Sequence, residues 1–327
     1  MSDAVDPWVL SDLATPWSVR VVVTLGVAEH MAAGITKIDE LAQKADCDTE
    51  SLARVLRHLV DKGVFHEPTE GEFALNAAAR VLLEPGPVRI LDLDGYGGRI
   101  AGAWSGLLGA VRTGRPTYEA VFGRPFWEDL DADPELAATY DSMMGYQGRG
   151  VPDPAVLVDD DWEDVRHVVD VGGGTGAMLA EILRAQPHVR GTLVDLPRAV
   201  ARSGEVFESA GVADRVTVSG QSFFDPLPGG ADVYLINAVL LDWPDEQACK
   251  LLSRCAEAVA PSGRVVVVGG VSAVRTASKG GLLLMVLNGG RTRNLDQFRV
   301  LAAEAGLAVT AHGYGPSGRF IVESRPN

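Results

Sequence analysis

The stretch V-V-D-V-G-G-G-T-G at residues 168–176 decides the fold class of this chain. A β-branched apolar run contains Asp170, and a glycine-dense turn follows it and opens into a helix-like segment. This pattern is typical of the first strand–helix corner of an α/β sheet, across which a nucleotide-type ligand lies. Glycines are needed there because a side chain would hold the ligand away from the backbone amides and the helix N-terminus.

A second acid supports this interpretation. Asp195 closes another β-like run, 25 residues after Asp170, and a carboxylate at the end of the second strand can accept hydrogen bonds from ribose hydroxyls. Dinucleotide sites prefer G-x-G-x-x-G, whereas this run is G-G-G-T-G followed by Ala177 and Met178, and the lysine of a P-loop is absent. The corner therefore favours a cofactor with a ribose and no phosphate, such as S-adenosylmethionine. A structural loop without a ligand is the alternative interpretation.

From this corner onward, strand-like and helix-like patterns alternate, which predicts a mainly parallel seven-stranded sheet in a Rossmann-like α/β domain. In such a sheet the ligand lies at the carboxyl ends of the strands. The expected strands are residues 167–171, 191–195, 214–218, 232–237, 263–269, 306–312 and 319–323.

The N-terminal part is mainly helical in pattern. Apolar residues recur at helical spacing over residues 8–31, and Pro16 is expected to divide or kink that helix. Asp48 is a candidate N-cap and Gly63 a helix stop, and residues 64–66 and 72–75 resemble a short β-ribbon. Three helices and a ribbon give a winged-helix-like outline. A DNA-binding role is the alternative, but the segment is not basic, so a dimerisation domain is favoured.

Composition limits the function classes. The net charge of −15 argues against nucleic acid or an anionic membrane as the main partner. No stretch approaches the roughly 20 apolar residues of a membrane span, and no secretory signal is visible. Three cysteines without metal-ligand spacing predict a cytoplasmic protein without a metal site. We expect a dimerisation domain at 1–87, a helical linker or substrate lid at 88–160, and a cofactor-binding domain at 161–327.

Together these features resemble the class I S-adenosylmethionine-dependent small-molecule O-methyltransferases, of the plant caffeate-like type and its actinobacterial polyketide-tailoring branch. The resemblance covers nearly the whole chain. It is carried by D-L-A-T-P at 12–16, the glycine-rich corner, S-F-F-D-P-L-P at 222–228, L-L-D-W at 240–243 and G-G-R-T-R at 289–293.

The resemblance implies a homodimer that binds S-adenosylmethionine and an aromatic or polyketide-type hydroxyl compound. Asp195 would hold the ribose and Leu196 would pack beside the adenine. The residues that would bind or adjoin the cofactor are Asp170, Gly172, Gly173, Gly174, Gly176, Asp195, Leu196, Ser222, Phe223, Asn237 and Trp243. Four residues would line the acceptor pocket, with ordinary core packing as the alternative for the methionines: Met143, Met144, Met285 and Asn288.

The chain departs from the family pattern where catalysis takes place. Leu241 stands where plant-like members have a catalytic histidine, and Gly270 and Gly281 replace the usual glutamate and aspartate. A neutral phenol with a pKa of about 10 is a poor nucleophile at pH 7, yet proximity and orientation can supply about 7–11 kcal/mol. We therefore expect methyl transfer driven by positioning, without a protein base.

Two other interpretations stay open. One anthracycline methyltransferase of the branch also has leucine at this place, but the branch includes a hydroxylase that keeps S-adenosylmethionine bound without transferring its methyl group. A fixed sulfonium could stabilise negative charge during hydroxylation, decarboxylation or cyclisation. A binding or regulatory protein on the same fold is the third interpretation.

Overall fold

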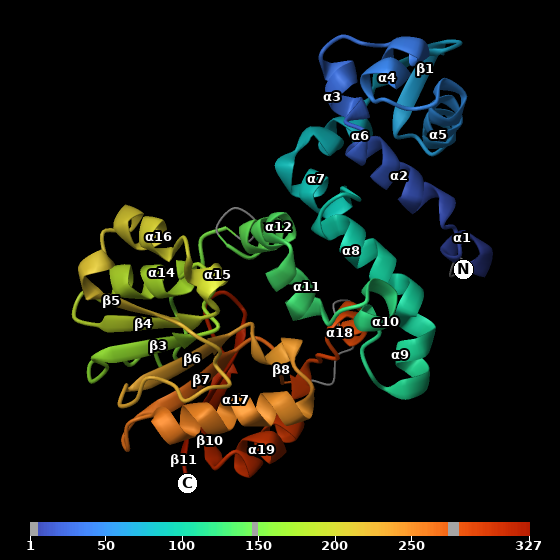
Figure 1. Cartoon of the computed structure of the whole chain (residues 1–327). Helices are drawn as coiled ribbons and strands as arrows, with labels where there is room; N and C mark the ends of the chain where they lie inside the picture. The colour runs from blue at the N-terminus through green and yellow to red at the C-terminus, as the bar shows by residue number, and fades with distance from the viewer. Residues whose placement is uncertain (1–5, 146–149, 274–280) are drawn as a thin grey trace, which may run out of the picture. The chain divides into compact units, whose positions relative to one another are not determined.

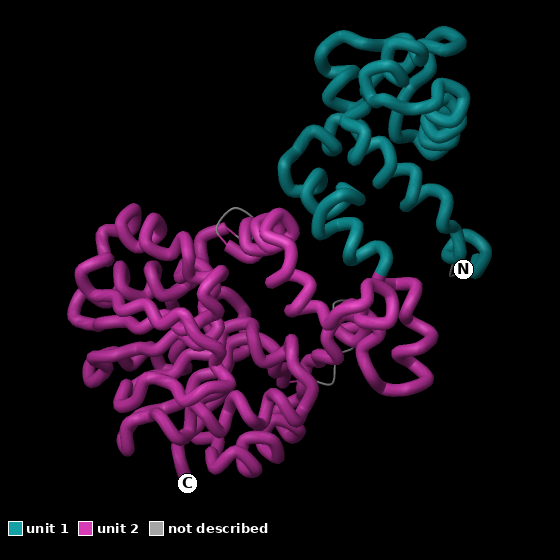
Figure 2. The backbone as a smooth tube through the Cα atoms, in the orientation of Figure 1, with its two compact units in different colours: residues 1–102 teal, residues 103–327 magenta. Residues whose placement is uncertain are grey.

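A computed structural model of the chain describes residues 6–145, 150–273 and 281–327. These residues belong to two compact units, 1–102 and 103–327 (Figure 2). The helical segment expected at 88–160 is divided between the two units, and its residues 146–149 lie outside the described residues.

The first unit contains short helices and one two-stranded ribbon (Figure 1). Its elements are α1 (Pro7–Leu10), α2 (Ala14–Thr24), α3 (Val27–Ala32), α4 (Ile38–Lys44), α5 (Thr49–Asp61), β1 (Phe65–Thr69), β2 (Glu72–Leu75), α6 (Ala77–Arg80), η1 (Val81–Leu83) and α7 (Pro85–Leu91), with α8 (Tyr96–Ala103) at the boundary.

Local chemistry explains the best-defined helix of this unit. The Asp48 side chain accepts a hydrogen bond of 2.8 Å from the Ser51 backbone N–H and so caps the start of α5. The helix ends before Gly63, because the left-handed φ of +82° at Gly63 does not fit a right-handed helix. β1 and β2 pair antiparallel around the turn at 70–71, which confirms the expected ribbon. Buried residues Leu41, Leu56 and Phe73 form the centre of its core.

The prediction for Pro16 was wrong. Pro16 lies in the first turn of α2, which runs unbroken from Ala14 to Thr24. The breaks fall at residues 11–13 and at Gly26, whose φ is +61°. A proline is tolerated in the first turn of a helix because the backbone N–H that it lacks has no intrahelical partner there.

The second unit carries the expected Rossmann-like sheet, in the order β10-β11-β7-β6-β3-β4-β5. All seven predicted strands are confirmed within a few residues. β3 to β7 are parallel, and β11 and β10 close one edge in antiparallel pairing. The strands are β3 (His167–Val171), β4 (Arg190–Asp195), β5 (Val216–Gly220), β6 (Val233–Asn237), β7 (Arg264–Val268), β10 (Leu307–Tyr314) and β11 (Phe320–Pro326).

Helices cover both faces of this sheet, with α14 and α16 on one side and α17 and α19 on the other (Figure 1). Successive strand residues point to opposite faces, so Val168 packs in the α14 layer and Val169 in the α17 layer. The remaining elements are η2 (Trp104–Gly106), α9 (Leu107–Thr113), α10 (Tyr118–Phe122), α11 (Phe126–Ala132), α12 (Pro134–Met144), α14 (Ala177–Ala185), α15 (Pro197–Val200), α16 (Ser203–Ser209), η3 (Ala213–Arg215), η4 (Leu240–Asp242), α17 (Asp245–Ala258), β8 (Val271–Ser272), α18 (Gly281–Leu287), β9 (Arg293–Asn294) and α19 (Leu295–Glu304).

Strand order fixes the place of a ligand site. β3 comes first along the chain in this sheet, yet it lies in the middle, with β4 on one side and β6 on the other. The connections therefore change direction at β3, and ligands of open α/β sheets bind at the carboxyl ends of the strands beside such a switch point. The corner at 172–176 follows β3 at that edge.

Candidate cofactor and acceptor site

Backbone geometry explains the glycines of the corner. Gly172, Gly174 and Gly176 have φ values of +74°, +59° and +85°, in the left-handed region that glycine adopts without strain. The Gly172 N–H donates to the Val194 carbonyl oxygen at 2.7 Å and so joins the corner to β4. The glycine run thus folds back against the second strand.

The space around each glycine differs. A Cβ on Gly173 would lie 2.4 Å from Asp170 Oδ2, and one on Gly176 would lie 2.4 Å from the Phe207 ring. A Cβ on Gly174, by contrast, would meet nothing within 4 Å. Gly173 and Gly176 are therefore required by packing, whereas the surface of the corner is open at Gly174.

Asp195 lies at the edge of that opening. Its carboxylate accepts the Gly174 backbone N–H at 2.8 Å and the Leu196 N–H at 2.7 Å. Burial raises the pKa of Asp195, and the two backbone N–H groups oppose that shift. The open position at Gly174 with a carboxylate beside it fits a ligand that presents hydroxyl donors, as a ribose does.

Asp170 lies underneath the corner. Its side chain is fully buried, and neither carboxyl oxygen has a hydrogen-bond partner of ordinary geometry among the described residues, although the Leu179 backbone N–H still acts to lower its pKa. Burial, and then the charge of Asp195, raises the pKa of Asp170 to about 7. Because it is covered by Gly173, Asp170 can influence a ligand only through the corner above it.

An aromatic cluster flanks the corner. The Phe223 ring lies 3.4 Å from the position of a Cβ on Gly172, and it meets the Trp243 ring edge-on at 5.8 Å between centroids. Trp243 also stacks with Trp127 of α11, at 5.8 Å and 22°. Phe224 completes the cluster, 4.8 Å from Trp243. The tertiary structure thus joins three chain segments of this unit into one apolar surface.

The other predicted cofactor residues lie at the ends of their strands. Leu196 is half-buried at the start of α15, and Ser222 follows β5, where its Oγ accepts the Phe224 N–H at 3.2 Å. Asn237 ends β6, but its side-chain oxygen already accepts a hydrogen bond from Arg319. Asn237 therefore helps to hold β6 to the segment before β11.

The turn after β6 contains the position of the missing base. Leu241 lies in η4, and a Cβ on Gly270 would approach both the Leu241 Cβ and its backbone nitrogen to 3.1 Å. On another side, a Cβ on Gly290 would lie 2.2 Å from the Leu241 carbonyl oxygen. Leu241 is thus packed between two glycines from distant parts of the chain.

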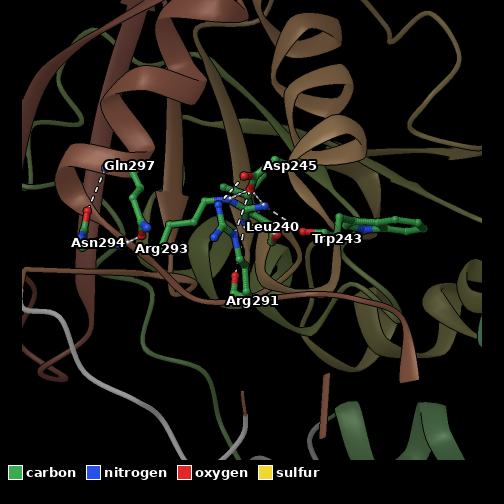
Figure 3. Close-up of polar contacts among 7 residues, drawn as sticks. All are labelled: Leu240, Trp243, Asp245, Arg291, Arg293, Asn294 and Gln297. Carbon is green, nitrogen blue, oxygen red and sulfur yellow. Dashed lines mark hydrogen bonds and ion pairs between the residues drawn. The ribbon is translucent and has the colours of Figure 1, made fainter. Parts of the chain in front are cut away.

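Arg293 holds this turn in place through hydrogen bonds (Figure 3). Sequence analysis did not single this residue out. Its side chain is fully buried and donates to the carbonyl oxygens of Leu240 and Trp243 and to Asp245. Burial acts to raise the pKa of Asp245, but hydrogen bonds from Arg291 and Arg293 outweigh it and leave that pKa below its ordinary value. Arg291 is a structural partner of this segment. The only sequence signal was the G-G-R-T-R stretch, which does not reveal burial.

The predicted acceptor residues fall into two groups. Met143 and Met144 end α12, where a Cβ on Gly145 would lie 3.4 Å from Thr175 Oγ1, so this helix end adjoins the corner. Met285 lies in α18, and Asn288 follows it and accepts the Gly290 N–H at 3.0 Å. Asn288 therefore adjoins the Leu241 turn.

The histidines of this unit lie elsewhere. His167 begins β3, at the amino end of the strand, and burial lowers its pKa. His188 contacts the Trp162 carbonyl oxygen, and His312 lies on the edge strand β10, separated from β6 by β11 and β7. Within the described ranges no group of three or more His, Cys, Asp or Glu could hold a metal ion. In the same ranges no helix is long and apolar enough to span a membrane.

Comparison with known proteins agrees with this geometry. Residues 104–308 match the family model of the O-methyltransferase domain, and residues 9–85 match the O-methyltransferase dimerisation domain. The chain is 40% identical over 306 residues to a 2,7-dihydroxy-5-methyl-1-naphthoate 7-O-methyltransferase of Streptomyces carzinostaticus, with 92% of each chain covered. It is 41% identical to the aclacinomycin 10-hydroxylase RdmB of Streptomyces purpurascens, over 92% of this chain and 83% of the relative.

A solved structure is similar over its whole length. It is the O-methyltransferase NcsB1 from neocarzinostatin biosynthesis, in complex with S-adenosyl-L-homocysteine and 1,4-dihydroxy-2-naphthoic acid. The TM-score is 0.89 and the identity 38%, with 100% of both chains covered. The chain belongs to the O-methyltransferase family. Its fold is the family's Rossmann-like domain preceded by a dimerisation domain.

Proposed function

We propose that this protein is an S-adenosylmethionine-dependent O-methyltransferase that acts on a hydroxyl of an aromatic, polyketide-type compound in secondary metabolism. The observation that carries the proposal is the open glycine corner beside Asp195 in a chain of the O-methyltransferase family. S-adenosylmethionine supplies a methyl group on a positively charged sulfur, and the acceptor oxygen takes that methyl group while the S–CH3 electron pair stays on sulfur.

The corner residues divide the work of binding the cofactor. Gly174 leaves room for the ligand, and Asp195 accepts hydrogen bonds from the ribose hydroxyls. Leu196, Ser222 and Phe223 border the adenine, and Trp243 extends this apolar surface. The remaining residues support the site indirectly, because they keep the corner and the end of β6 in shape. They are Asp170, Gly172, Gly173, Gly176 and Asn237.

The residues present favour an acceptor that needs no protein base. Leu241 cannot accept a proton, and Gly270 beside it has no side chain. A hydroxyl acidified by a carbonyl group on the same aromatic system ionises more readily, and its proton passes to solvent. Placing that oxygen in line with the methyl group then supplies the catalysis. Met143, Met144, Met285 and Asn288 border the acceptor in this proposal.

The protein acts as a homodimer in this proposal. The match to the dimerisation domain and the exposed apolar side chains of the first unit support it, since Trp8 is 84%, Leu10 75% and Leu13 71% exposed. Its net charge of −15 opposes nucleic acid as a partner. Three free cysteines agree with a reducing cytoplasm.

One incubation tests the reaction. The protein is mixed with S-adenosylmethionine and hydroxynaphthoates, beginning with 1,4-dihydroxy-2-naphthoic acid, then hydroxyanthraquinones, and the products are analysed by mass spectrometry. We expect the acceptor to gain one methyl group while one equivalent of S-adenosylhomocysteine forms. Among acceptors that are turned over, those whose hydroxyl is conjugated with a ketone carbonyl group, without an internal hydrogen bond to it, should react faster than matched compounds without that carbonyl.

A second candidate is methyl-free chemistry, favoured by the likeness to the 10-hydroxylase and by the absence of a base at Leu241. Here the acceptor changes mass while S-adenosylmethionine stays intact. The same spectra distinguish the two reactions. A binding protein would leave both compounds unchanged.

A further inference from the structure

The burial of Arg293 is not explained by charge neutralisation. Its side chain is 0% exposed, whereas its carboxylate partner Asp245 is 50% exposed and also pairs with Arg291, itself 48% exposed. Burying a guanidinium costs free energy unless each donor finds a partner. An arginine at the surface already supplies Asp245 with a cation, so the buried one has another role.

The remaining donors of Arg293 hold a turn. Nη1 donates to the Leu240 carbonyl oxygen at 3.1 Å, and Nη2 donates to that of Trp243 at 2.9 Å. Nε donates to Asp245 Oδ1 at 2.9 Å (Figure 3). The two carbonyl groups lie on either side of Leu241. A planar guanidinium can bind all three acceptors at once, which the single ammonium group of a lysine cannot match.

The backbone of Arg293 holds the facing segment. Its N–H donates to the Gly270 carbonyl oxygen at 2.9 Å, next to the pairing of β8 with β9. Gly270 is the residue whose Cβ position lies 3.1 Å from Leu241. Arg293 therefore binds both sides of the contact between the turn after β6 and the segment after β7.

We propose that Arg293 is a positioning residue for methyl transfer, which fixes Leu241 and Trp243 at the carboxyl end of β6. The inference rests on the proposed function, because the turn adjoins Asn288, which borders the acceptor in that proposal, and carries Trp243 of the cofactor surface. Arg293 touches neither acceptor nor cofactor in this proposal and acts through the turn alone. An enzyme without a base depends on alignment, and a misplacement of about 1 Å can cost about 10²-fold in rate.

The test compares Arg293→Ala and Arg293→Lys with Arg291→Ala, a control that loses a partner of the same carboxylate but no contact to the two carbonyl groups. Far-ultraviolet circular dichroism checks folding, and calorimetry measures the dissociation constant for S-adenosylhomocysteine. Near-ultraviolet circular dichroism reports the packing of Trp243, with Trp243→Phe as the reference for its bands. kcat is measured with the best acceptor from the incubation above.

We expect Arg293→Ala to lower kcat by about 10²-fold, far more than it weakens S-adenosylhomocysteine binding. It should also lose the near-ultraviolet bands that Trp243→Phe loses. Added guanidinium ion should restore part of both signals, and Arg291→Ala should resemble the wild type. Unchanged bands, or a kcat loss that follows the loss of cofactor affinity, would overturn the proposal.

If Arg293→Ala does not fold, Arg293→Lys is the deciding variant. A folded lysine variant with wild-type kcat and wild-type near-ultraviolet bands would refute the proposal that the turn needs a planar guanidinium. If the wild type methylates none of the acceptors, the proposed function fails. The near-ultraviolet comparison still tests whether Arg293 holds Trp243.

Discussion

A Cβ atom on Gly270 would lie 3.1 Å from the Cβ of Leu241. These are the positions at which the family resemblance predicts a glutamate and a histidine, 29 residues apart in the chain. In the folded protein the two positions are neighbours, so both departures from the family pattern fall in one place. With a φ of +79° at Gly270, that position also disfavours any side chain.

Restoring the imidazole with Leu241→His should leave turnover within about tenfold of the wild type, although general-base help is typically worth about 10²–10⁴-fold. An acceptor that is already acidic gains little from a base. The measurement is kcat from pH 5 to 9. Complete loss of turnover with intact S-adenosylhomocysteine binding would contradict the account based on positioning.

Asp195→Asn should weaken binding of S-adenosylhomocysteine by about 10- to 100-fold, since a hydrogen bond to a charged group contributes about 1.5–3 kcal/mol. Calorimetry measures the change. Asp225→Asn is the matched control, because Asp225 is exposed beyond β5. Equal dissociation constants for wild type and Asp195→Asn would remove the ribose contact from the proposal.

Two neighbouring glycines should respond differently to alanine. Gly173→Ala places a Cβ 2.4 Å from Asp170 Oδ2 and 2.6 Å from Leu193 Cδ1, so overpacking should cost about 1–3 kcal/mol of unfolding free energy. The Cβ of Gly174→Ala would meet no neighbouring atom within 4 Å. This variant should therefore lose mainly the free energy, about 1–2 kcal/mol, that a residue with a Cβ costs in the left-handed backbone conformation. Compared with Gly173→Ala, Gly174→Ala should weaken S-adenosylhomocysteine binding more for the same loss of unfolding free energy. Urea unfolding and calorimetry measure the two quantities. A larger relative loss of binding in Gly173→Ala would show that the corner is not open at Gly174.

Asp170 should make stability depend on pH. Its pKa is raised to about 7 in the folded protein, against about 3.9 in the unfolded chain. The folded state therefore holds the proton more tightly, and its contribution is complete below about pH 4 and is lost as the pH rises to about 7.

Asp170→Asn keeps the shape of the neutral acid and removes this titration. Urea unfolding of both proteins at pH 5 and pH 8 tests it, because the variant should lose less stability than the wild type between the two values. Equal losses would mean that Asp170 titrates normally.

The local pattern of the sequence was sufficient for the sheet and its corner. The inner strands β3, β4, β6 and β7 are buried on both faces, so each appears as a mostly apolar run, whereas the outer strands β5 and β10 keep exposed residues. The corner requires glycine wherever the backbone turns left-handed. The Asp48 cap and the Gly63 stop are equally local. Pro16 was misjudged because proline signals both the first turn of a helix and an interruption, and only the position of the helix start decides between them.

Contacts between distant segments were decided by the tertiary structure alone. The sequence contains Arg291 and Arg293 two residues apart, and nothing in it tells which guanidinium is buried against the Leu240–Trp243 turn. The stacking of Trp127 on Trp243 and the contact of Gly270 with Leu241 likewise join segments that are remote along the chain. Hydrophobic periodicity records which face of an element is buried, whereas the partner of a side chain depends on how the elements pack.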